Sequence, residues 1–248
     1  MKITNIKKMS GGKYKISLDN KKDMTLYEDV IIKNILLSGK NVDDNLMNKI
    51  TKDNNEAMIY NQSLKYISLR IRSEEELKIY LNKKNYDEKD IEKTIEKLKK
   101  AGYINDQLFA ASYTNDKINL TNDGPNKIRQ NLTNLKVEET IISNVISNID
   151  EEIISNKIDK LINKQIKANK KYSGFILKNK ILNYMINLGY DKDEVLKKLE
   201  SIDFSNNKDI QKEYQKLYKK YSPKYSGTKL DMVIKQKLYQ KGYDISSL

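Results

Sequence analysis

ILNYMINLGYD, residues 181–191, is one copy of a pattern that recurs along this chain of 248 residues and decides its fold. Two apolar residues lie four positions apart, and Gly or Asn, then Tyr, then Asp follow four positions later. The other copies are LKIYLNKKNYD (77–87), the degenerate IRQNLTNLKVE (128–138) and IKQKLYQKGYD (234–244). Tyr86, Val137, Tyr190 and Tyr243 follow one another at intervals of 51, 53 and 53 residues. A fixed period of this length indicates stacked helical units rather than one globular core.

Each unit is expected to contain three helices, and the second helix starts at a recognisable signal. Ser73 and Glu76 form a capping box, in which each side chain pairs with the backbone amide of the other residue. The Gly or Asn before each Tyr suits a left-handed residue that ends this helix. Asp87 and Asp191 are placed to cap the third helix of their units. The matching starts of the second helix are Gly124-Pro125, Ser173-Gly174 and Ser226-Gly227, and Pro suits the first helical turn.

The N-terminal segment has a different pattern. Residues 2–27 are predicted to form a three-stranded antiparallel meander, because Tyr14–Leu18 alternates apolar and polar residues and a Gly-Gly turn precedes it. Such a small sheet needs a cover. Helices from about Glu28 to Leu37 and from Asp43 to Asn54 are expected to supply it, with Gly39 as the stop signal.

The composition argues against several classes of enzyme. The chain has no Cys and no His, which removes thiol nucleophiles, imidazole chemistry and the commonest zinc ligands. No acidic cluster has a metal-binding spacing with supporting residues, and no Gly-rich phosphate-binding loop occurs. The sequence therefore predicts no catalysis, no cofactor and no metal. The absence of a signal-peptide run or a bilayer-spanning stretch predicts a soluble, cytoplasmic protein.

The net charge is +13 and is spread along the chain. Residues 1–60, 61–101, 150–202 and 203–248 carry net charges of +3, +3, +3 and +5, whereas residues 102–149 carry −1. This excess indicates a polyanion or an acidic protein as partner, although a Lys-rich solvated surface stays open as an alternative. Because only three of the basic residues are Arg, sequence-specific reading of DNA bases is not expected.

With these elements placed, the chain resembles the RecX family of recombinase regulators. The resemblance lies in Arg70–Leu77, Lys84–Asp87, Leu98–Ala110 and Gly124–Ile128 with Leu132, and is strongest over residues 56–149. The chain departs from the family pattern at Ile71, where Pro is usual, and at Asn85 and Lys136, where Gly is usual. These departures relax local backbone constraints and touch no chemical group.

The resemblance implies a mainly α fold: an elongated, curved array of tandem three-helix repeats after a small N-terminal β-meander/α domain. The expected divisions are 1–55 for that domain, 56–102, 103–149 and 150–202 for three repeats, and 203–248 for a truncated fourth. Because Leu248 is only five residues past Tyr243, the third helix of the fourth repeat is expected to be absent or a single turn.

The resemblance also implies a function. Members of the family bind the RecA recombinase, lie in the groove of its filament on single-stranded DNA, and restrain strand exchange and ATP hydrolysis in recombination, DNA repair and the SOS response. The chain is accordingly expected to be a monomeric regulator with weak direct affinity for DNA. An autonomous, non-sequence-specific nucleic-acid-binding protein and a scaffold for an unrelated acidic protein stay open as alternatives.

The candidate contacts with partner or DNA are basic residues whose type packing does not demand. They are Arg70, Arg72, Lys83, Lys84, Lys127, Arg129, Lys178, Lys180, Lys235 and Lys237. Lys83 and Lys84 have an alternative explanation, because cations near a helix C-terminus are favourable. The recurrence of Tyr86, Tyr190 and Tyr243 at one repeat position favours rings packed between helices with surface hydroxyls over base stacking. Phe109 and Tyr113 are also expected in the core.

Overall fold

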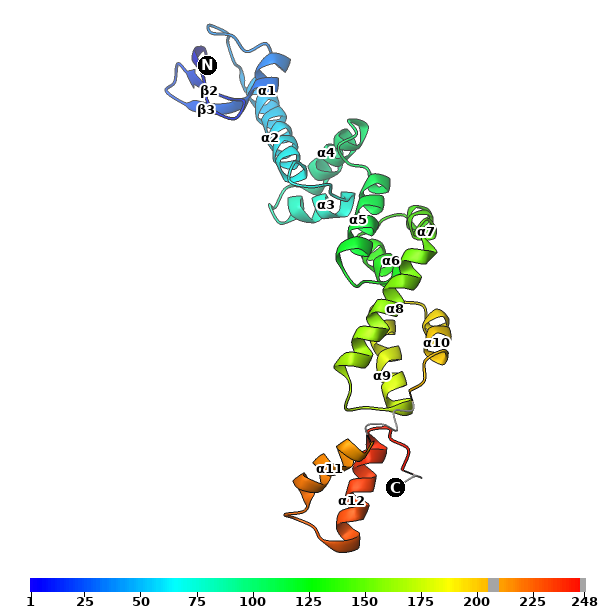
Figure 1. Cartoon of the computed structure of the whole chain (residues 1–248). Coiled ribbons are helices and arrows are strands. Elements are labelled where there is room, and N and C mark those ends of the chain that lie inside the picture. Colours follow the sequence, from blue (N-terminus) through cyan, green and yellow to red (C-terminus); the bar gives the residue numbers. More distant parts are fainter. Residues whose placement is uncertain (205–209, 246–248) are drawn as a thin grey trace. The chain divides into compact units, whose positions relative to one another are not determined.

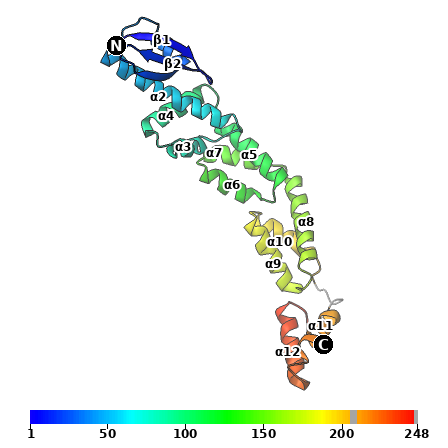
Figure 2. The ribbon, with the colours of Figure 1, turned by 90° about the vertical axis from the view of Figure 1, so that its left-hand side faces the viewer.

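The computed structural model describes residues 1–204 and 210–245 of the chain. It divides into two compact units, Met1–Ser112 and Tyr113–Leu248. Unit 1 combines a small sheet with helices, whereas the described elements of unit 2 are all helices (Figure 1, Figure 2). The predicted mainly α class with an N-terminal sheet is therefore confirmed.

The N-terminal strands form the predicted meander. Strands β1 (Ile3–Lys8), β2 (Lys13–Leu18) and β3 (Asp23–Tyr27) pair antiparallel in the order β1-β2-β3. Ile16 at the centre pairs with Ile6 on one side and with Met24 on the other. The turn before β2 uses Gly11 and Gly12, both at positive φ, which agrees with the sequence-based expectation.

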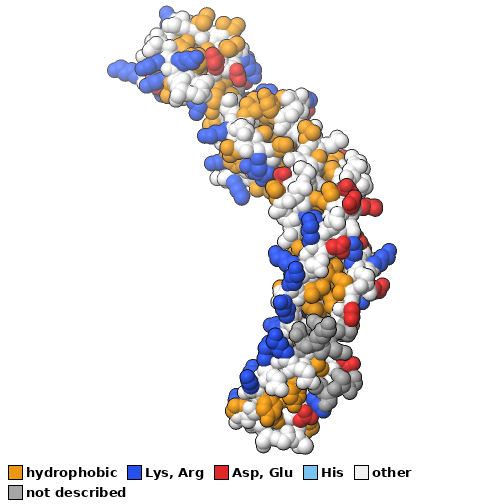
Figure 3. All heavy atoms as spheres, in the orientation of Figure 1, with side chains coloured by type: hydrophobic (Ala, Val, Ile, Leu, Met, Phe, Trp, Pro, Cys, Tyr) orange, Lys and Arg blue, Asp and Glu red, His pale blue; other side chains and the backbone are white. Residues whose placement is uncertain are grey.

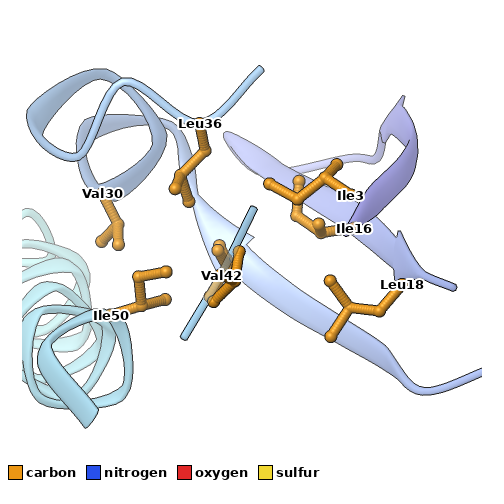
Figure 4. Packing of buried hydrophobic residues seen from close by; sticks show 8 residues of the cluster. Ile3, Ile16, Leu18, Val30, Leu36, Val42 and Ile50 are labelled. Atoms are coloured by element: carbon orange, nitrogen blue, oxygen red, sulfur yellow. The ribbon is translucent and has the colours of Figure 1, made fainter. Parts of the chain in front are cut away.

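Helices α1 (Glu28–Lys33) and α2 (Asp44–Ile67) cover this sheet. In Figure 4, Ile3, Ile16 and Leu18 from the strands meet Val30, Leu36 and Ile50 around Val42. Each of these side chains is buried, and burying one aliphatic side chain contributes about 1.5–3 kcal/mol. The helices thus supply the apolar surface that a three-stranded sheet lacks by itself.

Two predicted helix ends in this region are wrong. The first helix ends at Lys33 rather than Leu37, because Ile35 takes a left-handed conformation (φ 48°). The amides of Ile35 and Leu36 then bond to the carbonyls of Ile32 and Ile31, which closes the helix and turns Leu36 into the core. Gly39 has positive φ but lies in the following loop.

The second helix continues to Ile67 instead of ending at Asn54, so the predicted division at residue 55 falls inside α2. Asn54 does not break the helix because its side chain pairs with strand β3. Its amide donates to the Thr25 carbonyl (3.1 Å) and its oxygen accepts from the Tyr27 amide (3.1 Å). The C-terminal half of α2 then packs through Ile59 on the next core.

That core belongs to the predicted first repeat. Helices α3 (Glu74–Asn82) and α4 (Glu88–Lys100) pack with α2 around Ile59, Leu77, Leu81, Ile91, Ile95, Leu98 and Ile104. The structure confirms the Ser73–Glu76 capping box, the Asp87 cap of α4 and the left-handed conformation of Asn85 (φ 59°). Helix α5 (Asp106–Leu120) contains the boundary between the two units, and Phe109 is buried and Tyr113 half-buried on it.

Unit 2 continues the helical pattern. Its helices after α5 are α6 (Pro125–Asn134), α7 (Glu139–Ser147), α8 (Glu151–Ala168), α9 (Gly174–Asn187), α10 (Lys192–Glu200), α11 (Ile210–Tyr221) and α12 (Gly227–Gln240). The predicted starts of α6, α9 and α12 are confirmed, with Gly124, Ser173 and Ser226 as N-cap residues, and Asp191 caps α10. The expected end of the fourth repeat falls largely on residues 246–248, outside the described residues.

Successive repeats of unit 2 dock through the left-handed glycines. The amides of Gly124 and Asn126 donate to the carbonyls of Leu188 (2.6 Å) and Gly189 (3.0 Å), and the Ser173 amide donates to Lys241 (2.8 Å). The turn at the end of the second helix of one repeat thus accepts hydrogen bonds from backbone amides at the start of the second helix of the preceding repeat. Amides at a helix start have no acceptor within their own helix. A Cβ on Gly189 would lie 2.9 Å from the Lys127 Cα, and one on Gly242 would lie 3.0 Å from the Ile176 Cβ. Close approach therefore requires Gly at both positions, in addition to φ of 86° and 87°.

The Tyr residues that follow these glycines are packed, as predicted. Tyr243 is buried and Tyr190 is only 2% exposed, whereas Tyr86 is half-buried. The expectation of surface hydroxyls is wrong for Tyr190, because its hydroxyl is buried and has no hydrogen-bond partner among the described residues. Burial raises the pKa of Tyr190 to about 12. The ring therefore serves packing at the cost of an unpaired polar group.

Candidate partner-binding surface

The segment between α2 and α3 holds Arg70 at the surface of unit 1. Its guanidinium donates to both carboxylate oxygens of Glu76, with Nη1···Oε2 at 3.1 Å and Nη2···Oε1 at 2.5 Å. Glu76 also accepts the Ser73 amide (3.3 Å) within the capping box, so one carboxylate fixes both the helix start and the arginine. The Arg70 side chain remains 50% exposed. A fixed, half-exposed guanidinium keeps donors available for an external carboxylate or phosphate.

Arg72 is placed differently. Its side chain is only 13% exposed, and its guanidinium carbon lies 4.1 Å from the ring centroid of Tyr66. Tyr66 stacks on Tyr80 with centroids 4.1 Å apart and ring planes within 2°. The Lys84 ammonium lies 5.9 Å from the Tyr80 centroid. We call Tyr66, Arg70, Arg72, Glu76, Tyr80 and Lys84 the junction cluster; cation–π contacts and one shared carboxylate connect its members.

Exposed apolar residues flank Arg70 in the chain. Leu69 is 75% exposed and Ile71 is also exposed. Lys83, the C-cap residue of α3, is exposed as well. Arg and Tyr are enriched at the energetically important centre of protein–protein interfaces. Sequence reasoning missed Tyr66 and Tyr80, because their stack joins residues on two different helices. It also missed Leu69, because the sequence does not show that this side chain is exposed.

The predicted basic residues of unit 2 lie on three separate helices. On α6, Lys127 pairs with Asp123 (3.0 Å) and Arg129 pairs with Glu139. Although burial disfavours the charged carboxylate of Asp123, Lys127 and Lys117 hold its pKa below the usual value. Both predicted cations of the second repeat are therefore neutralised locally, which agrees with the low net charge of that segment.

The later candidates are less clustered. On α9, Lys178 is half-buried and the Lys180 ammonium lies 5.1 Å from the Tyr172 ring. On α12, Lys235 pairs with Asp231 (3.2 Å) and Lys237 donates to Gln240 (3.0 Å). Of the predicted set, the structure brings Arg70, Arg72 and Lys84 into one contact network. The pair Lys178 and Lys180 lies on α9 and the pair Lys235 and Lys237 lies on α12, so neither pair joins this network.

The described residues contain no group of three or more acidic side chains arranged to hold a metal ion. No helix within the described ranges is long and apolar enough to cross a membrane.

Comparison with known proteins identifies the helical repeats. Residues 60–98 match the family model for the first three-helix domain of RecX, and residues 105–146 match the model for the second. Both matches fall inside the predicted repeats 56–102 and 103–149. The resemblance stated from the motifs is thereby confirmed.

Curated relatives extend the similarity over most of the chain. The chain is 30% identical over 215 residues to the regulatory protein RecX of Listeria welshimeri, covering 86% of this chain and 79% of the relative. It is 31% identical over 195 residues to that of Listeria monocytogenes serotype 4a, covering 78% and 72%. It is 27% identical over 226 residues to that of Oceanobacillus iheyensis, covering 89% and 83%.

Solved structures agree with the sequence comparison. The crystal structure of a regulatory protein RecX superimposes with a TM-score of 0.71 at 25% identity, over 81% of this chain and 99% of that one. The fold of RecX from Lactobacillus salivarius also matches, with a TM-score of 0.54 over 60% of this chain and 98% of that one. With its paired helical domains, its relatives and its fold in agreement, the chain belongs to the RecX family of regulatory proteins.

Proposed function

We propose that this chain binds the RecA recombinase as a filament on single-stranded DNA and restrains its strand exchange and ATP hydrolysis. Membership of a family of regulatory proteins supports a regulatory role. The observation that carries the proposal further is the junction cluster, which lies inside the match to the first three-helix domain of RecX. There the described surface combines a half-exposed arginine with exposed Leu69 and Ile71.

The physical basis is simultaneous contact with several protomers. A protein built from tandem units can touch successive subunits of a helical filament, and weak contacts then add through effective concentration. Because the chain acts by occupying a surface, this function needs no catalytic residue, cofactor or metal. The recombinase is proposed to contribute acidic and apolar groups opposite Arg70 and Leu69, where a bidentate arginine contact would contribute both affinity and orientation.

Filament binding tests this directly, by co-sedimentation with preformed RecA filaments on single-stranded DNA. Arg70→Ala is expected to weaken binding about tenfold, the loss of one interface contact of roughly 1.4 kcal/mol. Lys15→Ala is the matched control, because Lys15 also pairs with a nearby carboxylate, that of Asp23 at 2.7 Å, its side chain is 47% exposed, and it is not a candidate contact. Circular dichroism checks that both variants fold, since a surface ion pair contributes about 1 kcal/mol or less.

Equal affinity of the two variants for the filament would indicate that the partner does not contact the junction cluster. Failure of the wild-type chain to sediment with filaments, together with retention of naked DNA, would favour the autonomous nucleic-acid-binding alternative. Binding to neither would favour a scaffold for another acidic protein.

A further inference from the structure

Helix α8 of unit 2 carries a regular row of lysines. Lys157, Lys160, Lys164 and Lys167 follow one another at intervals of three, four and three residues, and Lys170 and Lys171 follow in the next turn of chain. Intervals of three and four place side chains on one face of a helix. The buried residues Ile154, Ile158, Leu161 and Ile162 form a different stripe of α8. The lysine row is therefore the outer side of a helix anchored by its apolar side.

The first lysine of the row has a structural role. The Lys157 ammonium donates to the backbone carbonyls of Ile118 and Thr121, the latter at 2.8 Å, and burial lowers its pKa. Lys160, Lys164 and Lys167 differ, because they are exposed and form no ion pair with the described residues.

Little negative charge opposes this row. Between Ile153 and Lys171 the only acidic residue is Asp159, and the Lys198 ammonium of α10 pairs with it at 2.7 Å. In Figure 3, blue side chains form a column along the edge of α8 and continue onto α11, whereas red side chains gather on the α10 side. Unit 2 therefore has one face of predominantly positive charge.

The row continues into a hollow of about 270 Å³ between the turn after α8 and helix α11. Lys170, Lys171, Lys212, Lys216, Glu213 and Tyr243 line it. Burial alone would raise the pKa of Glu213, but Lys241 and Lys216 hold it below its usual value. Because Lys241 pairs directly with Glu213, the single carboxylate of the hollow is neutralised from within the fold. Lys216 also contacts this carboxylate, at 3.5 Å, so Lys170, Lys171 and Lys212 remain to attract an external anion.

We propose that these side chains form a track for the phosphate backbone of a nucleic-acid strand. The lysine track comprises Lys160, Lys164, Lys167, Lys170, Lys171, Lys212 and Lys216. From Lys160 to Lys167 it advances about 10 Å along α8, at roughly 1.5 Å per helical residue, and Lys170 and Lys171 follow in the turn after the helix. A linear series of ammonium groups matches a linear series of phosphates, and lysine neutralises phosphate as a point charge without reading bases.

The composition of the track favours a nucleic acid over an acidic protein. Protein interfaces centre on exposed apolar and aromatic anchors, and the only large hydrophobic of α8 with substantial exposure is Ile153, at the far end of the helix. At the turn after α8, the ring of Tyr172 lies 5.2 Å from the Lys171 ammonium and 5.1 Å from that of Lys180. An aromatic ring among cations is a common feature of single-strand binding sites. This inference deepens the proposed function and rests on it for the biological source of the strand.

The test measures binding of labelled thirty-base oligo-dT by the full chain, without RecA, by fluorescence anisotropy at several salt concentrations. The variant Lys160→Gln/Lys164→Gln/Lys167→Gln removes three exposed charges and keeps good helix formers. Its matched control is Lys89→Gln/Lys93→Gln/Lys97→Gln, which removes three exposed charges of α4 at helical spacing. A thirty-base-pair duplex titrated in parallel tells whether single-stranded or duplex DNA is the preferred source of phosphate.

The track variant is expected to bind at least about tenfold more weakly, and the slope of log K against log salt should become shallower by about 2, or roughly 0.7 per lost phosphate contact. The control should change affinity less than about twofold. Equal losses of oligo-dT affinity in the two variants would overturn the track, because they would show that binding depends on the overall positive charge rather than on these lysines. Competition by polyglutamate as effective as by unlabelled oligo-dT would overturn it in favour of an acidic protein.

The two proposals fail separately. Loss of oligo-dT binding in the track variant, with RecA filament ATPase unaffected by the wild-type chain, would support the track and reject the proposed function. Inhibition of the filament ATPase by the wild-type chain, without any specific loss of oligo-dT binding in the track variant, would support the proposed function and reject the track.

Discussion

The Gly189 carbonyl accepts the Asn126 amide at 3.0 Å, which joins the end of α9 to the start of α6. The residue that ends one helix therefore also caps another helix, 63 residues earlier in the chain. The carbonyls of Leu188 and Lys241, each one residue before a left-handed glycine, likewise accept the amides of Gly124 (2.6 Å) and Ser173 (2.8 Å) at helix starts. One short motif therefore serves as both local stop signal and docking contact.

Gly189→Ala is expected to destabilise the chain by about 3 kcal/mol, because a Cβ would combine a left-handed backbone penalty with overlap at Lys127. Gly102→Ala is the matched control, since Gly102 has φ of 77° but no atom within 4 Å of the added carbon. Its expected cost is about 1 kcal/mol. Urea unfolding compares the two, and equal losses would show that close docking does not constrain residue 189.

Replacing Ile35 by Gly is expected to stabilise the chain by about 1 kcal/mol. Ile35 is 67% exposed and has a left-handed backbone, so its side chain gains little from burial and bears a steric penalty. Ile32→Gly, at an exposed helical position of α1, should instead destabilise by a similar amount. Thermal unfolding measures both, and a destabilised Ile35→Gly variant would contradict the strain argument.

Tyr190→Phe is expected to leave stability unchanged or raise it by about 1 kcal/mol. Its hydroxyl is buried without a partner among the described residues, so removing it deletes an unpaired polar group and keeps the ring. Tyr190→Ala should cost about 3–5 kcal/mol through loss of the buried ring. Chemical denaturation checks the order, and a loss of 2 kcal/mol in the Phe variant would indicate that the hydroxyl is bonded.

Asp53 is expected to make stability fall with acidification. Burial opposes its charge, but Lys33 (2.7 Å) and Asn34 (2.8 Å) donate to its carboxylate and hold the pKa of Asp53 below its usual range. Because the pKa of Asp53 is lower in the folded state than in the unfolded state, its ionised carboxylate stabilises the fold in full at any pH above the unfolded-state pKa. This stabilisation is lost as the pH falls through the folded-state pKa. Asp53→Asn should flatten unfolding free energy against pH below about 4. The same flattening in Asp116→Asn, at an exposed position, would contradict this assignment.

Features set by neighbouring residues could be predicted from the sequence. The capping box at Ser73, the caps at Asp87 and Asp191 and the left-handed Gly189 depend on short-range hydrogen bonds and sterics, and all were predicted. Contacts between distant residues decided the rest. Asn54 continues α2 because its side chain pairs with β3, which no local pattern reveals.

The candidate surfaces divide in the same way. Arg70 and Arg72 are recognisable from the motif, but their different exposure depends on Glu76 and on the stack of Tyr66 with Tyr80. The lysine spacing on α8 is visible in the sequence, yet its continuation into Lys212 and Lys216 depends on the hollow that these residues line together with Lys170 and Lys171. Whether any of these residues touches a partner is still a prediction.

The chain is proposed to regulate a recombinase filament by occupying it. The most direct measurement is ATP hydrolysis by RecA on single-stranded DNA, with increasing amounts of the wild-type chain. We expect inhibition at less than one chain per RecA protomer, and about tenfold more Arg70→Ala should be needed for the same effect. Unchanged hydrolysis at a saturating excess of the wild-type chain would contradict the account.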